Sequence, residues 1–185
     1  LVVIAIIALL IGILLPALGP AMNAGRQARC LGNLRGIGQG IELYKNDFRE
    51  LFPVAKYMPD PWLTSSNEPS LNEALGAGDY IEPLSLVYQC PGDKVIFDTE
   101  YVDDDGVTRK CGSSYRYQSG IGGQRLEETW FFTRLEFPPS EIPVVNDYDG
   151  GAFETQDGRF VTVGFFHDKR MFFYADGSAG GSKAN

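Results

Sequence analysis

The chain has 185 residues, of which 44% are hydrophobic and 22% are charged. It is long enough to bury the core of one domain and too apolar for a disordered chain. Its 24 acidic residues against 16 basic ones give a net charge of −8, which argues against nucleic acid as a partner, because phosphates are usually bound by clustered Lys and Arg. The 22 glycines and 11 prolines are costly inside helices, so most of the chain is expected to form strands and loops.

The chain opens on LVVIAIIALLIGILLPAL, residues 1–18, which contains no charged, amide or hydroxyl side chain. A helix that is apolar on every side is stable only in a bilayer or among other helices. This one would span about 27 Å, close to the roughly 30 Å of a hydrocarbon core. A secretory signal peptide would have a basic start and a small-residue cleavage site. We therefore favour a helix kept in the mature protein, either as a membrane anchor or as an assembly surface.

Helical periodicity continues beyond this segment. Pro16 and Pro20 predict a kink or local break, because proline lacks an amide donor and clashes with the preceding turn. The following residues carry an apolar stripe that can lie on a globular core, and its members are Leu34, Ile37, Ile41, Tyr44 and Phe48. A row of small residues recurs every four positions, and its members are Ala24, Ala28, Gly32, Gly36 and Gly40. Each Gly costs about 0.8 to 1.0 kcal/mol in a helix relative to Ala, so we expect close approach of another element here rather than a merely loosened helix.

From about Leu51 the sequence predicts a head of short strands and long loops. Runs rich in Val, Phe and Tyr, bounded by turn residues, favour an antiparallel sheet. These runs are SLVYQC, DKVIFDTEYV, GVTRKC, SSYRYQSG, IPVVND, RFVTVGFF and KRMFFYADG. A short helix is expected over residues 70–77. The sequence DDDG, residues 103–106, predicts a hairpin turn.

The three cysteines predict one disulfide. Cys90 and Cys111 flank the predicted hairpin, and a bridge between them would close a loop of about 22 residues, worth roughly 3 kcal/mol in the chain-entropy model. Such a bond would fit an oxidising compartment outside the cytoplasm. Cys30 lies in the helical region and is expected to be an unpaired, partly buried thiol, with an intermolecular bond as the alternative.

The sequence offers little catalytic chemistry. The single histidine, His167, is expected to pack at a strand and to hydrogen-bond near the turn formed by Asp176 and Gly177. The motifs CxxC, HExxH, CxxCH, GxGxxG and GxSxG do not occur, so zinc, haem, phosphate-loop and hydrolase sites have no support. The weak candidates for Ca²⁺ ligands, which offer carboxylate oxygens on loop sequence, are Asp147, Asp149 and Asp157. A solvated acidic loop is the favoured interpretation, and no cofactor is expected.

The run LVVIAIIALLIGILLP, followed by ARCLGNLRGIGQGIELYKNDF, resembles the N-terminal helix of bacterial type IV pilin-like proteins and pseudopilins. Three stretches of the head are similar to the prepilin-type group whose heads end in a His-x9-Asp-Gly motif, and they are YQCPGD (88–93), PPSEIPVVND (138–147) and FHDKRMFFYADGS (166–178). His167, Asp176 and Gly177 stand in that motif, with eight residues between His and Asp instead of nine. The family's leader, methylated Phe and nearby acidic residue would precede Leu1, so the resemblance implies that the mature chain begins a few residues earlier.

The resemblance implies a pilin-like α+β fold, with an N-terminal helix (residues 1–50) broken near Pro16 and packed on an antiparallel β-rich head (residues 51–185). It implies a structural subunit of an extracellular filament at the cell surface, a type IV pilus or a type II secretion pseudopilus, and not an enzyme. Identical subunits would sit in the inner membrane before assembly. The residues expected to pack against sister helices are Leu1, Val2, Val3, Ile4, Ile6, Ile7, Leu9, Leu10, Ile11, Ile13, Leu14, Leu15 and Pro16. The implied partners are a leader peptidase, a platform protein and an assembly ATPase.

Two other functional classes stay open at the level of sequence. A membrane-tethered binding module, including a minor pseudopilin, would contact a secreted substrate through its aromatic-rich head. An enzyme would use His167 with Asp168 or Asp176 on a metal. Assembly distinguishes these classes, because only a filament subunit forms a concentration-dependent polymer with buried N-terminal helices.

Overall fold

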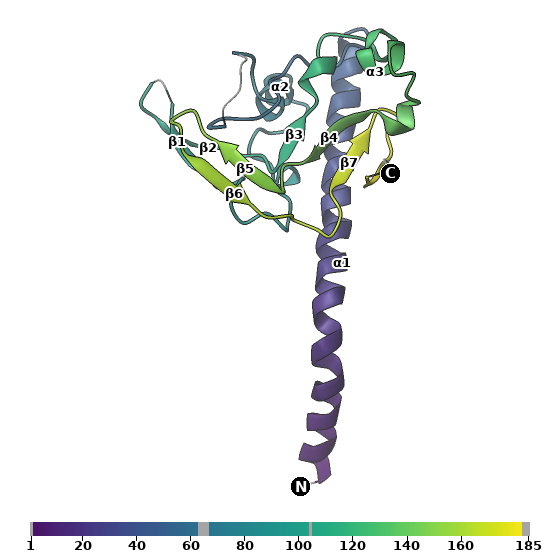
Figure 1. Cartoon of the computed structure of the whole chain (residues 1–185), viewed down its shortest axis with the longest axis vertical. Helices are drawn as coiled ribbons and strands as arrows, with labels where there is room; N and C mark the ends of the chain where they lie inside the picture. The colour runs from purple at the N-terminus through teal and green to yellow at the C-terminus, as the bar shows by residue number, and fades with distance from the viewer. Residues whose placement is uncertain (1, 63–66, 104, 183–185) are drawn as a thin grey trace.

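The computed structural model describes residues 2–62, 67–103 and 105–182, without the side chains of residues 2, 5 and 8. Its dominant element is one long helix, α1 (Val2–Asp47). The C-terminal half of α1 lies against the head, and the N-terminal half projects away from it (Figure 1). Two of the predicted assembly positions, Leu1 and the side chain of Val2, lie outside the described residues.

The helix α1 is continuous through Pro16 and Pro20, so the predicted break near Pro16 is wrong. Proline has a fixed φ that lies in the helical region, and each proline removes only one backbone hydrogen bond. The Leu, Ile and Ala residues on both sides of the prolines include good helix formers. The two prolines therefore weaken the helix locally without ending it.

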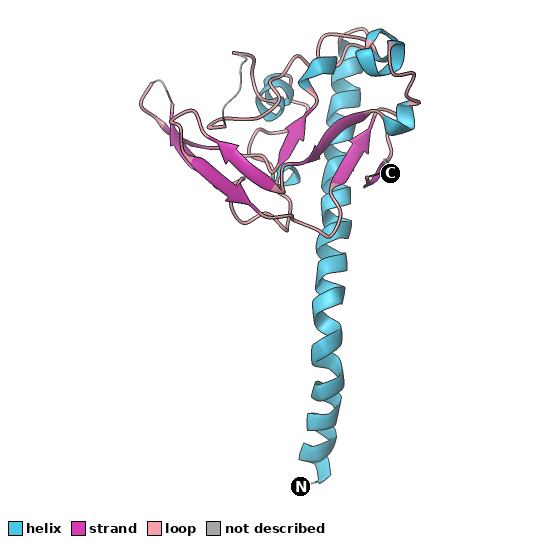
Figure 2. Cartoon of the chain, viewed as in Figure 1, coloured by secondary structure: helices cyan, strands magenta, loops and turns pink. Residues whose placement is uncertain are grey.

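The head forms antiparallel sheets within the described residues, which confirms the expected α+β class (Figure 2). The central sheet has the order β3-β4-β7-β8, and its strands are β3 (Tyr115–Tyr117), β4 (Pro143–Asp147), β7 (Met171–Tyr174) and β8 (Ala179–Gly181). Two separate hairpins are formed by β1 (Glu100–Val102) with β2 (Thr108–Lys110) and by β5 (Gly151–Glu154) with β6 (Phe160–Val163). The central sheet is the one that contacts α1.

Short helices and turns connect these strands. The α-helices are α2 (Leu71–Ala77) and α3 (Trp130–Thr133). The 3-10 helices are η1 (Leu86–Tyr88), η2 (Ser119–Ile121), η3 (Leu126–Glu128) and η4 (Pro139–Glu141). The helix predicted over residues 70–77 is confirmed as α2, and the amide of its N-cap Ser70 donates to Glu73 Oε2 at 2.8 Å.

The structure confirms some of the predicted strands and contradicts others. The hairpin turn at 103–106 is confirmed between β1 and β2, with Gly106 at a φ of +76° and with residue 104 outside the description. The run SLVYQC is not a strand, because its centre forms η1. The run DKVIFDTEYV is a strand only at its end, because the Asp93 carboxylate accepts three amide hydrogen bonds from residues 95–97 and folds them into a turn. Strands β5 and β8 lie outside the predicted runs.

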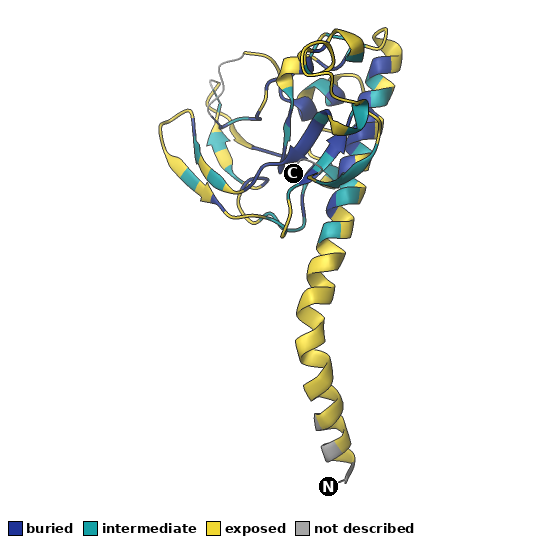
Figure 3. Cartoon of the chain, turned by 45° about the vertical axis from the view of Figure 1, so that its right-hand side comes forward, coloured by how far each residue is buried: buried dark blue, intermediate teal, exposed yellow. Residues whose placement is uncertain are grey.

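The main core lies between α1 and the central sheet. Leu34, Ile37 and Ile41 of the predicted stripe are fully buried there, whereas Phe48 stacks on Tyr44 at the surface with ring centroids 4.2 Å apart. Figure 3 shows this division, with buried residues on the upper part of α1 and exposed residues below.

The small-residue row packs closely only at its C-terminal end. A Cβ added at Gly36 would lie 2.8 Å from the Val87 side chain, and one added at Gly40 would lie 2.5 Å from Ile81. A Cβ on Gly38, which the predicted row did not include, would lie 2.1 Å from the Phe173 ring. The other three members of the row, Ala24, Ala28 and Gly32, are exposed. The close approach therefore belongs to the helix–head contact in this chain.

We expect Ile37→Ala to lower the free energy of unfolding of the head by about 2 to 5 kcal/mol, because it leaves a cavity in the helix–sheet core. The matched control is Leu43→Ala, since Leu43 is exposed on the same helix and should change that free energy by no more than about 0.5 kcal/mol. Urea unfolding of the full chain in non-ionic detergent, followed by tryptophan fluorescence, measures both values. Equal stabilities of the two variants would contradict the helix–head packing.

Candidate functional site

The first candidate surface is the exposed N-terminal part of α1. We call residues 3–18 the apolar arm. Every large apolar side chain that the structure describes in this arm is between 49% and 71% exposed. They are Val3, Ile4, Ile6, Ile7, Leu9, Leu10, Ile11, Ile13, Leu14, Leu15 and Leu18. So many exposed apolar side chains on one segment mark an interaction with a membrane or another protein.

The arm is also compatible with membrane insertion. Among the described residues, one helical segment, Leu9–Asp47, is long and apolar enough to cross a membrane, and the most apolar stretch of it is not covered by the rest of the chain. Pro16 and Gly12 lie on the same exposed surface. The geometry therefore offers the arm either to lipid or to other helices.

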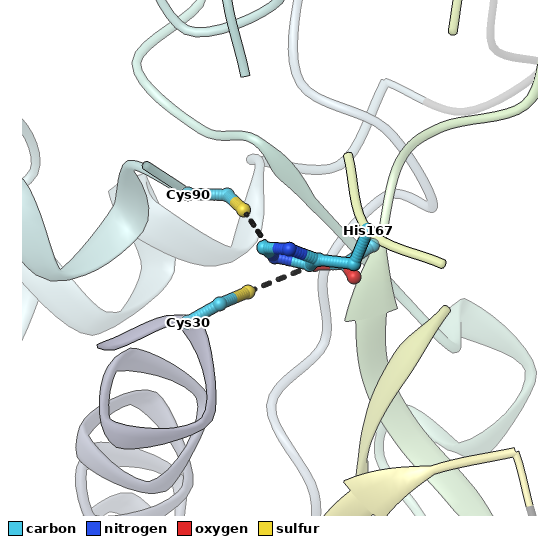
Figure 4. Close-up of side chains that lie close together, drawn as sticks. Cys30, Cys90 and His167 are labelled. Atoms are coloured by element: carbon cyan, nitrogen blue, oxygen red, sulfur yellow. Dashed lines mark hydrogen bonds between the residues drawn. The ribbon is translucent and has the colours of Figure 1, made fainter. Parts of the chain in front are cut away.

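The second candidate is a group of buried polar side chains where α1 meets the head. We call Cys30, Cys90, Asp147 and His167 the Cys-His cluster. Cys30 lies on α1, Cys90 follows η1, Asp147 ends β4, and His167 lies in the loop before β7. Their sulfur atoms, carboxylate oxygen and ring nitrogen all lie within 4.8 Å of one another. Figure 4 shows the thiols of Cys30 and Cys90, which come from two different segments of the chain, both directed at the His167 imidazole.

Two short contacts organise the cluster. Cys90 Sγ lies 3.1 Å from His167 Nε2, and the Cys30 thiol donates to Asp147 Oδ1 at 3.1 Å. The Tyr115 hydroxyl lies 3.3 Å from Cys30 Sγ. The amide of Met171 donates to Asp147 Oδ2 at 2.9 Å, which orients the carboxylate. Both cysteines and Asp147 are 0% exposed, whereas His167 is half-buried.

Hydrogen bonds around the sequence CPGD, residues 90–93, hold Cys90 in place. The Cys90 amide donates to Ser114 Oγ at 3.0 Å, and that hydroxyl donates to Asp93 Oδ2 at 2.6 Å. A Cβ at Gly92 would lie 2.5 Å from the carbonyl oxygen of Phe166. The Cys90 turn therefore lies directly against the loop that carries His167, and only glycine allows this approach.

A buried ion pair stabilises the other side of the loop that carries His167. The Asp149 side chain is 0% exposed and accepts a hydrogen bond at 2.8 Å from Arg170 Nε. Its other carboxylate oxygen accepts from the Phe166 amide at 3.0 Å. Asp149 thereby links the end of the β4 segment to both ends of the loop that carries His167.

The cluster shifts the pKa values of its members in opposite directions. Hydrogen bonds from Cys30 and His167 lower the pKa of Cys90 to about 6, despite its burial. The hydrogen bond with Cys90, together with burial, raises the pKa of Cys30. Burial and the nearby Cys90 thiolate raise the pKa of Asp147 to about 7. The hydrogen bond to Cys90 raises the pKa of His167, so Cys90 and His167 favour a thiolate–imidazolium pair.

This arrangement suits ligation better than nucleophilic catalysis. A catalytic cysteine is activated by a neighbouring histidine but must be open to its substrate, and Cys90 is fully buried. A groove of about 720 Å³ between α1 and the loop reaches the cluster on its imidazole side. Its lining includes Gln27, Phe166 and His167. The thiols lie behind the imidazole, where an ion can be enclosed.

The predicted disulfide is wrong, because Cys90 and Cys111 are both unpaired thiols in the structure. Cys111 belongs to a second core with Met58 and Trp62, and its sulfur accepts a hydrogen bond from the Trp62 indole at 3.3 Å. Cys30 is fully buried rather than partly buried, so an intermolecular bond through it would require the helix–head contact to open. The bridge across the hairpin failed because the two cysteines face different cores.

The other predicted site residues do not form a common site in the structure. His167 contacts Cys90 at 3.1 Å, and the Asp176 carboxylate accepts a hydrogen bond from the Ser178 amide within its own turn. The three weak calcium candidates do not converge either. Asp147 joins the Cys-His cluster, Asp149 pairs with Arg170, and Asp157 pairs with Arg159.

The sequence analysis missed the cluster as a unit. One signal was present in the sequence. Each of the four members lies in a stretch that carries the family resemblance, and these stretches contain ARC, YQCPGD, IPVVND and FHD. Comparison of the chain with protein-family models, with curated proteins and with solved structures gave no match.

Proposed function

We propose that this chain is a structural subunit of an extracellular helical filament of the type IV pilin-like kind, a pilus or a secretion pseudopilus. The observation that carries the proposal is the apolar arm, whose described side chains are exposed while the C-terminal part of the same helix, from Cys30 on, packs against the head. The arm therefore has a direction set by the head. Copies of the chain can align their arms in one bundle and place their heads on its outside.

The energetics favour such a bundle. Relative to an arm exposed to water, burying apolar surface stabilises by about 25 cal/mol per Å², so about 400 Å² of arm buried against one neighbour contributes on the order of 10 kcal/mol. The two partners would use different faces of the arm, and heterologous contacts of this kind build an open helix when the rotation does not close.

The alternative is a membrane-tethered binding module or minor pseudopilin, and it is favoured by the same arm, which a bilayer can also cover. Both interpretations share a membrane-inserted state, which in the filament proposal is the inner-membrane store of subunits. A tether, however, needs no rigid connection between its apolar segment and the head. The helix α1 is uninterrupted, and its C-terminal part packs on the head through the buried Leu34, Ile37 and Ile41. This rigid connection supports the filament proposal.

Image reconstruction of filaments sheared from cells that produce the protein tests the proposal, with mass spectrometry to identify the subunit. We expect the apolar arms in the filament core and the heads on the outside. Chains that stay single in lipid, with arms that contact only acyl chains, would refute the filament and favour the tether. A leader peptidase, a platform protein and an assembly ATPase are further partners that this proposal implies.

A further inference from the structure

We propose that Cys30, Cys90, Asp147 and His167 form a closed structural site for Zn²⁺, which joins the long helix to the head. This inference does not depend on the filament proposal, because it concerns how the chain holds its own elements together. It assigns a role to two cysteines and a histidine that the apolar arm does not use.

The donor set fits zinc. Structural zinc sites are almost always tetrahedral, with thiolate, imidazole and sometimes carboxylate ligands, at about 2.3 Å for sulfur and about 2.0 to 2.2 Å for nitrogen and oxygen. These bond lengths place ligand atoms about 3.3 to 3.8 Å apart in a tetrahedron. In the cluster, the Cys90–His167 and Cys30–Asp147 contacts are 3.1 Å, and the largest separation is 4.8 Å. Small side-chain adjustments therefore suffice to close the site around one ion.

The charge of the cluster calls for a cation. The Asp147 carboxylate is fully buried, and its side-chain hydrogen bonds come from the Cys30 thiol and the Met171 amide, neither of which carries a positive charge. Burying an ionised carboxylate is costly unless it is paired, and the imidazole of the cluster already pairs with Cys90. A divalent ion would compensate both this carboxylate and the thiolates. On binding, the proton of the Cys30 thiol and the proton shared by Cys90 and His167 pass to solvent, and no electron is transferred.

The surroundings supply the outer contacts that metal sites require. Hydrogen bonds to the ligands orient them and tune their affinity for the metal. The Met171 amide holds the carboxylate, and the Tyr115 hydroxyl contacts Cys30 Sγ. The groove on the imidazole side offers a route for the ion.

The site would connect four segments that are far apart in the chain. Cys30 is the first buried residue along the described part of α1, so it lies near the point where the helix leaves the head. Figure 3 shows the change from exposed to buried residues along the helix. A metal ion at this point would fix the base of the projecting helix to β4 and to the loops at Cys90 and His167. The ion would thereby stabilise the direction of the arm as well as the fold.

The test is metal binding by the full chain, purified in non-ionic detergent under reducing conditions and titrated with ZnCl₂ and with CoCl₂. We expect one ion per chain by elemental analysis, and Co²⁺ absorption bands typical of tetrahedral thiolate ligation. Cys90→Ser and His167→Ala should lose the ion. Tyr115→Phe, which keeps all four ligands, should weaken Zn²⁺ binding by about 10- to 100-fold.

Cys111→Ser is the matched control, because Cys111 is an equally buried thiol outside the cluster. It should bind Zn²⁺ as the unmodified chain does. Near-ultraviolet circular dichroism checks the fold of each variant, and His167→Ala keeps the test valid if Cys90→Ser does not fold, since His167 is only half-buried. Wild-type affinity in His167→Ala, absence of stoichiometric Zn²⁺ in the reduced chain, or a Cys30–Cys90 disulfide in protein purified from cells would each overturn the proposal.

Discussion

Replacing Ile7 or Leu10 with aspartate is expected to abolish filaments while the head stays folded. Both side chains are at least half exposed on the apolar arm, so the change removes no contact within the head. In a bundle of arms the new carboxylate would be buried without a partner, which costs several kcal/mol at every subunit contact. Negative-stain microscopy of sheared material measures the loss of filaments, and thermal unfolding followed by circular dichroism checks the head.

Membrane insertion has to be separated from assembly in this experiment. One Asp at the centre of a membrane helix costs about 2.5 to 3.5 kcal/mol, whereas each Ile, Leu or Val contributes about −0.3 to −0.6 kcal/mol, so the remaining apolar side chains of the arm sum to about −3 to −6 kcal/mol. Insertion is therefore weakened but kept, and membrane fractionation should still recover the variants. The matched control is Leu84→Asp, an exposed leucine on the head, which should leave filaments intact. Normal filaments from Ile7→Asp would refute the proposed core.

Replacing Arg170 with methionine is expected to lower the free energy of unfolding of the head by about 3 to 5 kcal/mol. Arg170 pairs with Asp149, whose side chain is 0% exposed, and its loss would leave that carboxylate buried with its charge uncompensated. The Asp149 contact with the Phe166 amide also positions the loop that carries His167. Methionine keeps much of the side-chain volume, so the effect reports the lost charge rather than a cavity.

Lys110→Met is the control for this change. Lys110 pairs with Asp98 at the surface, where both side chains are exposed, and an exposed pair contributes about 0 to 1 kcal/mol. Urea unfolding of the full chain followed by tryptophan fluorescence compares the two variants. A loss of less than about 1 kcal/mol in Arg170→Met would show that Asp149 is not held by this ion pair.

Features that depend on neighbouring residues were predictable from the sequence. The apolar opening, the buried stripe of Leu34, Ile37 and Ile41, and the helix beginning after Ser70 all follow from spacing along the chain. The hairpin at residues 103–106 follows from its turn residues. Local competition caused some of the errors, since Asp93 uses its carboxylate to fold residues 95–97 into a turn where β-forming residues predicted a strand.

The Cys-His cluster was not predictable in this way. Its contacts join residues 117 positions apart for Cys30 and Asp147, and 77 positions apart for Cys90 and His167. The loop-closure entropy, which favoured a Cys90–Cys111 bridge, gives the stability that such a bond would contribute. It does not determine which side chains face each other.

The sequence by itself therefore determined that this chain has an apolar helix that cannot remain in water and an acidic head with strands, because hydrophobic content and period are local properties. Only the tertiary structure decided that the helix runs unbroken through its prolines. The same holds for the contact of two of the chain's three cysteines with the single histidine and a buried carboxylate. The packing of α1 on the central sheet brings those four residues together, and that packing depends on the shapes of surfaces that are distant in the chain.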